Sequence, residues 1–355
     1  MSKFGNTPGL AAAGALCVLL FSADAQANGC IIVRPSSALT LDLEDVHTPR
    51  QGRFELSMAY RYLYSDRHFR GREEESHRQA EGTDVRNEVH TIDYTLTYRH
   101  SDRWSFSAAL PYVTANRSSL YEHDRVSRHA MEADGIGDLR LMAYRSLALG
   151  ESERPRGVTL GFGVKLPTGK DDVTDIAYRP DGPEVRNVDQ SIQPGDGGFG
   201  FFAEAQAYAR VFDDHTFAFF TGSYLVNPRD TNGVSTHRRR ETEAVMSVAD
   251  SYQARAGFSR MLQSVEGLTV DAGLRIEGVP ADDLVGDSNG FRRPGYAVYF
   301  EPGFNYRKGP HRFNLNVPIA IERNRVKSKA DRLTGRHGDA AFADYLVMAS
   351  YTFGW

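Results

Sequence analysis

The chain has 355 residues, 25% charged side chains and a formal net charge of −4 at pH 7. A negative net charge argues against nucleic acid as a partner, because binding to phosphates requires an excess of Lys and Arg. The mean hydropathy of −0.46 suits a soluble protein. Transmembrane β-barrels have similar values, however, since only alternate residues of each strand face lipid. Composition therefore leaves both classes open.

The N-terminus has the features of a secretory signal peptide. Lys3 provides a positive charge, residues 10–21 form an apolar run, and an A-x-A cleavage site follows at 25–27. The apolar run is too short to span a membrane as a helix, and no later stretch approaches the roughly 18 apolar residues that such a helix needs. We therefore predict a signal peptide over residues 1–27. Residues 28–52 are expected to form a periplasmic extension or a plug inside the domain that follows.

From residue 53 onward, apolar and polar residues alternate in a regular series of segments. Successive side chains of a β-strand point to opposite faces, so the alternation of Phe54, Leu56 and Met58 predicts a strand with one lipid-facing side. The predicted strands, in chain order, cover residues 53–65, 87–99, 103–113, 137–147, 157–166, 199–211, 216–226, 250–262, 267–279, 296–307, 312–322 and 345–355.

The connections between these strands alternate between short and long. The short ones are 100–102, 149–156, 213–215, 263–266 and 308–310, and the long ones are 66–86, 114–136, 167–198, 227–249, 280–295 and 323–341. Short periplasmic turns and long extracellular loops characterise outer-membrane barrels. We therefore predict that residues 53–355 form an all-β transmembrane antiparallel β-barrel of about 12 strands, with ten or fourteen as alternatives. Its location would be the outer membrane of a Gram-negative cell, with both termini periplasmic.

Proline interrupts several of the predicted strands or follows them directly. Because proline has no N–H to donate to a strand ladder, it marks bulges and strand ends. We expect irregular strand geometry at four positions: Pro111, Pro167, Pro280 and Pro318.

The last predicted strand alternates strictly and finishes on the aromatic residue Trp355. It resembles the closing strand of bacterial outer-membrane barrels, whose terminal aromatic residue is read by the insertion machinery. The resemblance implies that the barrel assembly machinery is a partner through Trp355 and that outer-membrane lipids surround the barrel. The run 237–240 contains three arginines in a long connection, and such clusters bind phosphates. We therefore expect contact with lipopolysaccharide.

Two glycine-containing motifs face each other across one predicted hairpin, Gly135-Ile136-Gly137-Asp138 and Leu166-Pro167-Thr168-Gly169. They resemble the G-x-G-D and L-P-T-G hairpin of a family of outer-membrane proteins labelled as transporters of the meta-pathway of phenol degradation. This resemblance implies a barrel that passes small, often apolar or aromatic, organic molecules. It brings no catalytic residues. The motif residues are Gly135, Gly137, Asp138, Leu166, Pro167, Thr168 and Gly169.

The predicted inner face of the barrel carries charges of both signs. Such charges select and orient solutes in a narrow pore, or they pair with one another and fill a closed interior. The lumen-lining candidates are Arg61, Asp93, Lys165, Glu204, Arg255, Asp271, Arg275, Glu277, Glu301, Arg307 and Glu322.

These features together predict a passive, porin-like outer-membrane channel whose partner is a small organic solute. The prediction includes no catalytic residues, cofactor or metal. The alternatives are a lipid-modifying enzyme of the outer membrane and a non-conducting structural or surface protein. The sequence leaves open the identity of the solute, the oligomeric state and whether residues 28–52 plug the pore.

Overall fold

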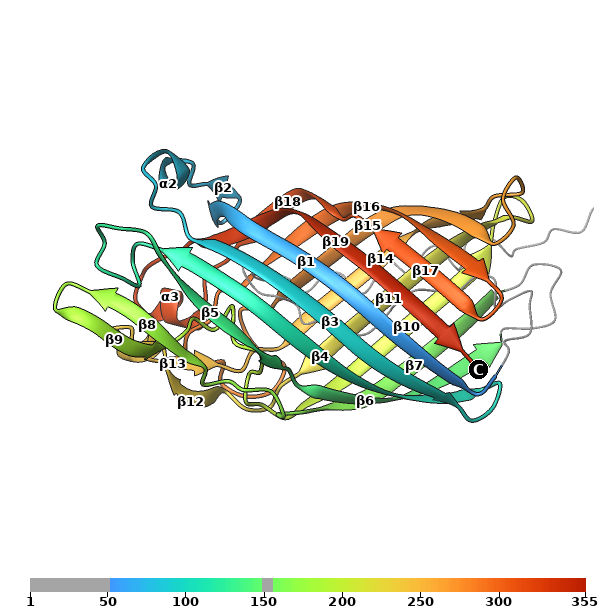
Figure 1. Cartoon of the computed structure of the whole chain (residues 1–355), viewed down its shortest axis with the longest axis horizontal. Helices are drawn as coiled ribbons and strands as arrows, with labels where there is room; N and C mark the ends of the chain where they lie inside the picture. The colour runs from blue at the N-terminus through green and yellow to red at the C-terminus, as the bar shows by residue number, and fades with distance from the viewer. Residues whose placement is uncertain (1–51, 149–155) are drawn as a thin grey trace, which may run out of the picture.

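The structure is a computed structural model that describes residues 52–148 and 156–355. The predicted signal peptide and almost all of the predicted extension or plug over 28–52 lie outside the described residues. The described chain forms a closed antiparallel β-barrel with twelve strand positions, as predicted (Figure 1). Within the described ranges, no helix is long and apolar enough to cross a membrane.

The strands follow one another around the barrel in chain order. They close between first and last, where β1 and β19 pair from Glu55↔Gly354 to Phe69↔Ala340. The strand positions are β1 (Phe54–Arg70), β3 (Arg86–Arg99), β4 (Trp104–Ser119), β5 (His129–Ile136) with β6 (Leu139–Ala148), β7 (Arg156–Leu166), β10 (Gly200–Arg210), β11 (Thr216–Val226), β14 (Ser251–Met261), β15 (Leu268–Val279), β16 (Gly295–Lys308), β17 (His311–Asn316) with β18 (Ile319–Arg325), and β19 (Ala340–Gly354).

Exposure alternates along the strands as the period-two pattern predicts. On β3, Tyr94 and Leu96 are exposed, whereas Asp93 and Thr95 between them are buried. The apolar residues thus form the outer surface, and the polar residues point into the lumen. This arrangement is the reverse of a soluble protein and suits a barrel surrounded by lipid.

Two strand positions are broken, and each break lies at a proline. The C-terminal half of β4 pairs with β5, and its N-terminal half pairs with β6. The interruption between β5 and β6 falls at Gly137, opposite Pro111. β17 and β18 are likewise separated at 317–318, where Pro318 lacks an N–H. The prediction of 114–136 as a connection is therefore wrong in part, because β5 occupies its last eight residues.

The long connections gather at one end of the barrel, on the left in Figure 1, and the short turns lie at the other end with the C-terminus. We call these the loop end and the turn end. The small elements of the loop end are β2 (Glu73–Glu74), α2 (His77–Ala80), β8 (Thr174–Arg179), β9 (Gly182–Asn187), β12 (Thr231–Ser235), η2 (Glu241–Glu243), β13 (Val245–Ser247) and α3 (Lys329–Leu333).

One stretch of the connection between β7 and β10 folds into the barrel. Residues 188–196, which we call the inward segment, follow the exposed β8–β9 hairpin. Val188 and Ile192 are 0% exposed and belong to the apolar cluster that includes Leu63 and Val89 from the barrel wall. The inward segment therefore fills part of the lumen near the loop end.

Candidate functional site

Charged side chains from β1, β15 and β16 meet inside the barrel. Arg61 and Glu277 form an ion pair with an Nη2–Oε1 distance of 2.6 Å. Arg275 is 3.8 Å from the Glu277 carboxylate and forms an ion pair with Glu301. Each of these four residues is at most 7% exposed. Because burial of an unpaired charge costs several kcal/mol, the pairing is what makes their inward position stable.

The ion pairs continue toward β14. Arg255 forms an ion pair with Asp271, and its Nε lies 3.0 Å from Oε1 of Glu301. The Asp271 carboxylate also accepts hydrogen bonds from Asn305 (3.0 Å) and Asn316 (3.1 Å). Three positive and three negative groups are joined in this way, so the cluster carries no net charge. We call it the lumen ion-pair network: Arg61, Arg255, Asp271, Arg275, Glu277 and Glu301.

Four further lumen candidates also lie on the inner face. Asp93, Lys165 and Glu204 are buried, and Arg307 is half-buried near the turn end of β16. The structure gives the three buried groups these partners: Arg140 for Asp93, Asp196 for Lys165, and the Tyr144 hydroxyl, which donates to Glu204 at 3.1 Å.

Glu322 does not lie in the lumen, so its prediction is wrong. Its carboxylate is 2.9 Å from Nε of the exposed Arg72 and accepts a 2.7 Å hydrogen bond from the Tyr296 hydroxyl. The cause is a register shift between β16 and β18. Val298 pairs with Glu322, whereas the next residue of β16, Tyr299, pairs with Ala320. Ile321 is the extra residue, and a bulge of this kind turns the following side chain to the other face.

The residues of the family motif form a clamp around the inward segment. The Asp138 carboxylate accepts backbone hydrogen bonds from Gly169 (3.0 Å) and Asp196 (3.3 Å). The Thr168 hydroxyl donates to the Gly137 carbonyl at 3.0 Å. The Asp138 side chain, at the strand break, thus holds both the start of the connection after β7 and the end of the inward segment.

The glycines of this clamp allow three backbones to touch. A Cβ added to Gly169 would lie 2.8 Å from both Gly137 and Gly195, and one added to Gly195 would lie 2.3 Å from the Gly169 carbonyl oxygen. Lys165 lies beside them, paired with Asp196 and 4.0 Å from Asp138. Any larger residue at these glycines would push the inward segment away from the wall.

The other motif residues shape the two strand ends. Gly135 has a φ of +152°, and a Cβ there would lie 3.5 Å from Pro194 of the inward segment. Leu166 is the last residue of β7 and pairs with Leu139. Pro167 follows it, where no further ladder hydrogen bond is made. The motif therefore has a structural role in holding the inward segment against the wall.

A cavity of about 630 Å³ lies above the inward segment, at the loop end. We call it the vestibule. Val188, Asp189 and Gln190 of the inward segment line it, together with residues from the other long connections. Among the described residues, its lining holds five carboxylates and twelve arginines: Arg70, Arg78, Arg117, Arg125, Arg179, Arg186, Arg238, Arg239, Arg240, Arg293, Arg325 and Arg336.

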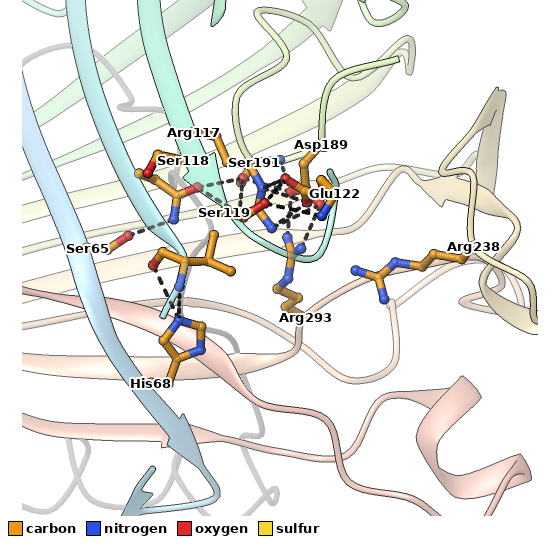
Figure 2. Close-up of polar contacts among 12 residues, drawn as sticks. Ser65, His68, Arg117, Ser118, Ser119, Glu122, Asp189, Ser191, Arg238 and Arg293 are labelled. Atoms are coloured by element: carbon orange, nitrogen blue, oxygen red, sulfur yellow. Dashed lines mark hydrogen bonds and ion pairs between the residues drawn. The ribbon is translucent and has the colours of Figure 1, made fainter. Parts of the chain in front are cut away.

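Asp189 is held between arginines, as Figure 2 shows. Arg293 donates to both of its oxygens at 2.7 Å, and Arg117 lies 3.6 Å away. Burial alone would raise the pKa of Asp189, but the two guanidinium groups outweigh burial and hold that pKa well below its usual value. Arg117 in turn is 2.9 Å from Glu122. The cluster fixes the inward segment to β4 and to the connection before β16.

Arg238 reaches toward the same cluster from the connection between β12 and β13 (Figure 2). Its guanidinium carbon is 3.7 Å from the centroid of the Phe291 ring, which Arg293 also approaches at 4.7 Å. Burial lowers the pKa of Arg238, and Arg293 lowers it further. Its side chain nevertheless remains 38% exposed, because it lines the vestibule. An arginine keeps its proton even so, and the charge faces the cavity.

His68 has both ring nitrogens engaged by neighbouring loops. The backbone N–H of Val85 donates to Nε2 at 2.8 Å, and Nδ1 lies 2.8 Å from the Asp339 carboxylate, which Arg78 also contacts. This contact ties β1 to the connections before β3 and β19. Within residues 52–148 and 156–355, no group of three or more His, Cys, Asp or Glu side chains could hold a metal ion.

The sequence pattern did not identify the vestibule. Asp189, Arg117 and Arg293 come from three separate parts of the chain, and only the fold brings them together. One signal was available, since Val188 and Ile192 are apolar residues within the polar run 186–193 and the glycine-rich run 195–200 follows them. Arg140, the partner of Asp93, could also have been found, because it lies between two leucines, the partly exposed Leu139 and the exposed Leu141.

No protein-family model matches the chain, and no curated protein matches it. Among solved structures, it is similar to an outer membrane channel from Pseudomonas putida F1, with a TM-score of 0.58, 14% identity, and coverage of 88% of this chain and 99% of that one. At this identity, the likeness shows the fold, which is that of an outer-membrane β-barrel. It does not confirm the resemblance to the phenol meta-pathway family.

Two further similar structures are more distant. The β domain of the Bordetella autotransporter BrkA has a TM-score of 0.44 and 12% identity, with coverage of 86% of this chain and 100% of that one. The Pseudomonas putida toluene transporter TodX has a TM-score of 0.38 and 11% identity, with coverage of 87% and 91%. At these TM-scores, neither likeness bears on what this chain transports.

Proposed function

We propose that the protein is a passive outer-membrane channel for small organic solutes. The observation that carries this proposal is the vestibule, a cavity of about 630 Å³ at the loop end of a closed barrel. Its volume is typical of pockets that hold small organic molecules. The inward segment forms part of its lining and narrows the route below it, so passage would be restricted to small solutes.

The finer part of the proposal is the chemical class of the solute. The motif residues of the hairpin at 135–169 resemble a family labelled as transporters of the phenol meta-pathway, and in this structure they hold the inward segment in place. We propose that this segment sets the width of the route and that the solutes are small organic molecules, including aromatic ones.

The proposal includes a location and an orientation. Exposed apolar residues around the wall suit surrounding outer-membrane lipids, and the arginine-rich loop end suits lipopolysaccharide phosphates. The turn end, where β1 begins and the described chain ends at Trp355, would face the periplasm. Trp355, whose ring stacks on Phe54 at 5.9 Å and on Phe353 at 5.8 Å, would be recognised by the barrel assembly machinery.

Conductance in planar lipid bilayers tests the channel. Protein whose folding is verified by heat-dependent migration on SDS gels should give discrete conductance steps. Flux of benzoate into liposomes should exceed flux into protein-free liposomes. Folded protein that gives neither conductance nor flux would contradict the channel, and hydrolysis of the liposome lipid would indicate the enzyme alternative.

A non-conducting structural protein is the second candidate, and the lumen ion-pair network favours it. Three arginines and three carboxylates pair within the barrel, and such pairing can fill an interior without leaving a path. The same bilayer measurement separates the two candidates, because a filled lumen gives no conductance at any voltage or salt concentration.

A further inference from the structure

The charge of the vestibule differs in sign from that of the whole chain. The protein has a formal net charge of −4, whereas the described lining of the vestibule has twelve arginines against five carboxylates. The excess of positive charge is therefore confined to the vestibule. Low-dielectric walls around a cavity with one sign of charge concentrate the field and attract ligands of the opposite sign.

The five carboxylates of the lining are already paired within the protein. Each has an arginine partner at hydrogen-bond or ion-pair distance, so none is left to neutralise the remaining guanidinium groups. The pairs are Asp189 with Arg293 at 2.7 Å, Asp331 with Arg325 at 2.7 Å, Asp339 with Arg78 at 2.7 Å, Glu122 with Arg117 at 2.9 Å, and Glu243 with Arg240 at 3.3 Å.

Four lining arginines have no acidic side-chain partner among the described residues. Arg179 donates to the backbone carbonyl of His123 at 2.9 Å, and the other three are Arg125, Arg239 and Arg336. Arg125, Arg239 and Arg336 are exposed, and they come from the connection between β4 and β5, the connection between β12 and β13, and the connection after α3. Arg238 adds a further charge at the cavity. Its guanidinium lies over the Phe291 ring, and it shares Glu243, at 3.9 Å, with Arg240. Guanidinium groups without an acidic partner of their own thus reach the cavity from different sides.

We propose that the vestibule binds small organic anions that carry a carboxylate group, and that it thereby selects them among the solutes of the channel. This inference rests on the proposed function, since it names the solute class of the same cavity. The geometry of Arg293 on Asp189 shows the vestibule already binding one carboxylate through two parallel N–H···O bonds. That arrangement is the one a planar guanidinium makes with planar anions.

The lining also indicates an organic anion rather than an inorganic one. Tyr121, which is 43% exposed, lines the cavity with its ring, and the guanidinium of Arg78 lies 5.3 Å from the ring centroid. This ring can contact a carbon skeleton beside the arginines. A cavity of about 630 Å³ is also far larger than a phosphate ion needs. The ligand class is therefore a carboxylate on a small apolar body.

Direct binding to protein refolded without lipopolysaccharide tests the proposal. The probes are benzoate and its neutral analogue benzamide, measured by isothermal titration calorimetry in detergent. We expect benzoate to bind at least about tenfold more tightly than benzamide, because only the anion pairs with guanidinium groups. Raising NaCl from about 50 to about 500 mM should weaken benzoate binding through screening. Inorganic phosphate at the same concentration should not displace benzoate.

The variant R125Q/R239Q/R336Q removes three charges and no described ion pair, and it should weaken benzoate binding at least about tenfold. The matched control R53Q/R103Q/K308Q removes three exposed charges from the turn end and should bind as the unmodified protein does. Should the first variant migrate as unfolded protein, R125K/R239K/R336K takes its place. It keeps the charge but loses the planar fork, and benzoate binding should fall about threefold.

Equal binding of benzoate and benzamide would overturn the proposal. So would unchanged binding by the vestibule variant, or displacement of benzoate by phosphate. Failure of the proposed channel function would give a different result. Benzoate would still bind through these arginines, but the protein would show no conductance in bilayers, so the anion site would stand and the channel would not.

Discussion

At the scale of single residues, Asp138 shows how one side chain can fix the geometry of a lumen. Its two carboxylate oxygens accept backbone hydrogen bonds from positions 31 and 58 residues away. No other type of side chain of this length presents two acceptors in this way. In this structure, Asp138 of the G-x-G-D motif thus attaches the connection after β7 to the barrel wall.

Asp138→Asn should therefore loosen the inward segment. The amide replaces one acceptor by a donor and leaves a backbone N–H without a partner, which costs about 1–3 kcal/mol. We expect the free energy of unfolding in urea to fall by that amount and cleavage by trypsin at Arg186 to become faster. The control Asp181→Asn, at the exposed tip between β8 and β9, should change neither quantity.

Glu301→Gln should have a larger effect. Glu301 is 1% exposed and neutralises both Arg275 and Arg255, so the substitution leaves buried positive charge without compensation. Removal of one partner from a buried pair costs about 3–5 kcal/mol. Urea unfolding measures the loss, and Glu88→Gln at an exposed, weakly paired site should cost less than about 1 kcal/mol. Equal effects would show that Glu301 is hydrated in the folded protein.

At the scale of elements, the strands were predictable because their signal is local. Each strand alternates with period two, so Tyr94 and Asp93 can be assigned to opposite faces without knowledge of their neighbours. The same rule failed at Glu322, where one extra residue in β18 reverses the face. A bulge depends on how β18 pairs with β16, and the sequence of β18 alone does not predict that pairing.

Leu274→Lys tests the assignment of faces. Leu274 is 54% exposed near the middle of β15, so a lysine there would lie in lipid and cost about 2–4 kcal/mol. Unfolding in lipid vesicles measures this cost. Val265→Lys, in the adjacent short turn where lysine reaches water, should be nearly neutral. A neutral result for both would place β15 outside the bilayer.

At the scale of the whole molecule, the sorting of connections was visible in the sequence, whereas the vestibule was not. Loop lengths can be counted directly once the strands are known. The contact of Asp189 with Arg293 joins residues 104 positions apart, and no periodicity connects two irregular loops. The barrel wall therefore follows from the sequence, while the site at its end required the fold.

The proposed orientation can be checked on intact cells. An epitope inserted at 180–182, between β8 and β9, should be labelled from outside, because this tip lies at the loop end. An epitope inserted at 213–214, in the turn between β10 and β11, should be labelled only after permeabilisation. The opposite result would invert the barrel in the membrane.

The pairing of β1 with β19 has a consequence for how the protein is made. Because Glu55 pairs with Gly354, the barrel cannot close until nearly the whole chain has been synthesised and exported. Contacts so distant in sequence form slowly, and until they form, two long strand edges stay open and prone to pair with other chains. The protein is therefore most vulnerable to aggregation before its last strand reaches its first, and a factor that shields or aligns those two edges would govern the yield of folded barrels.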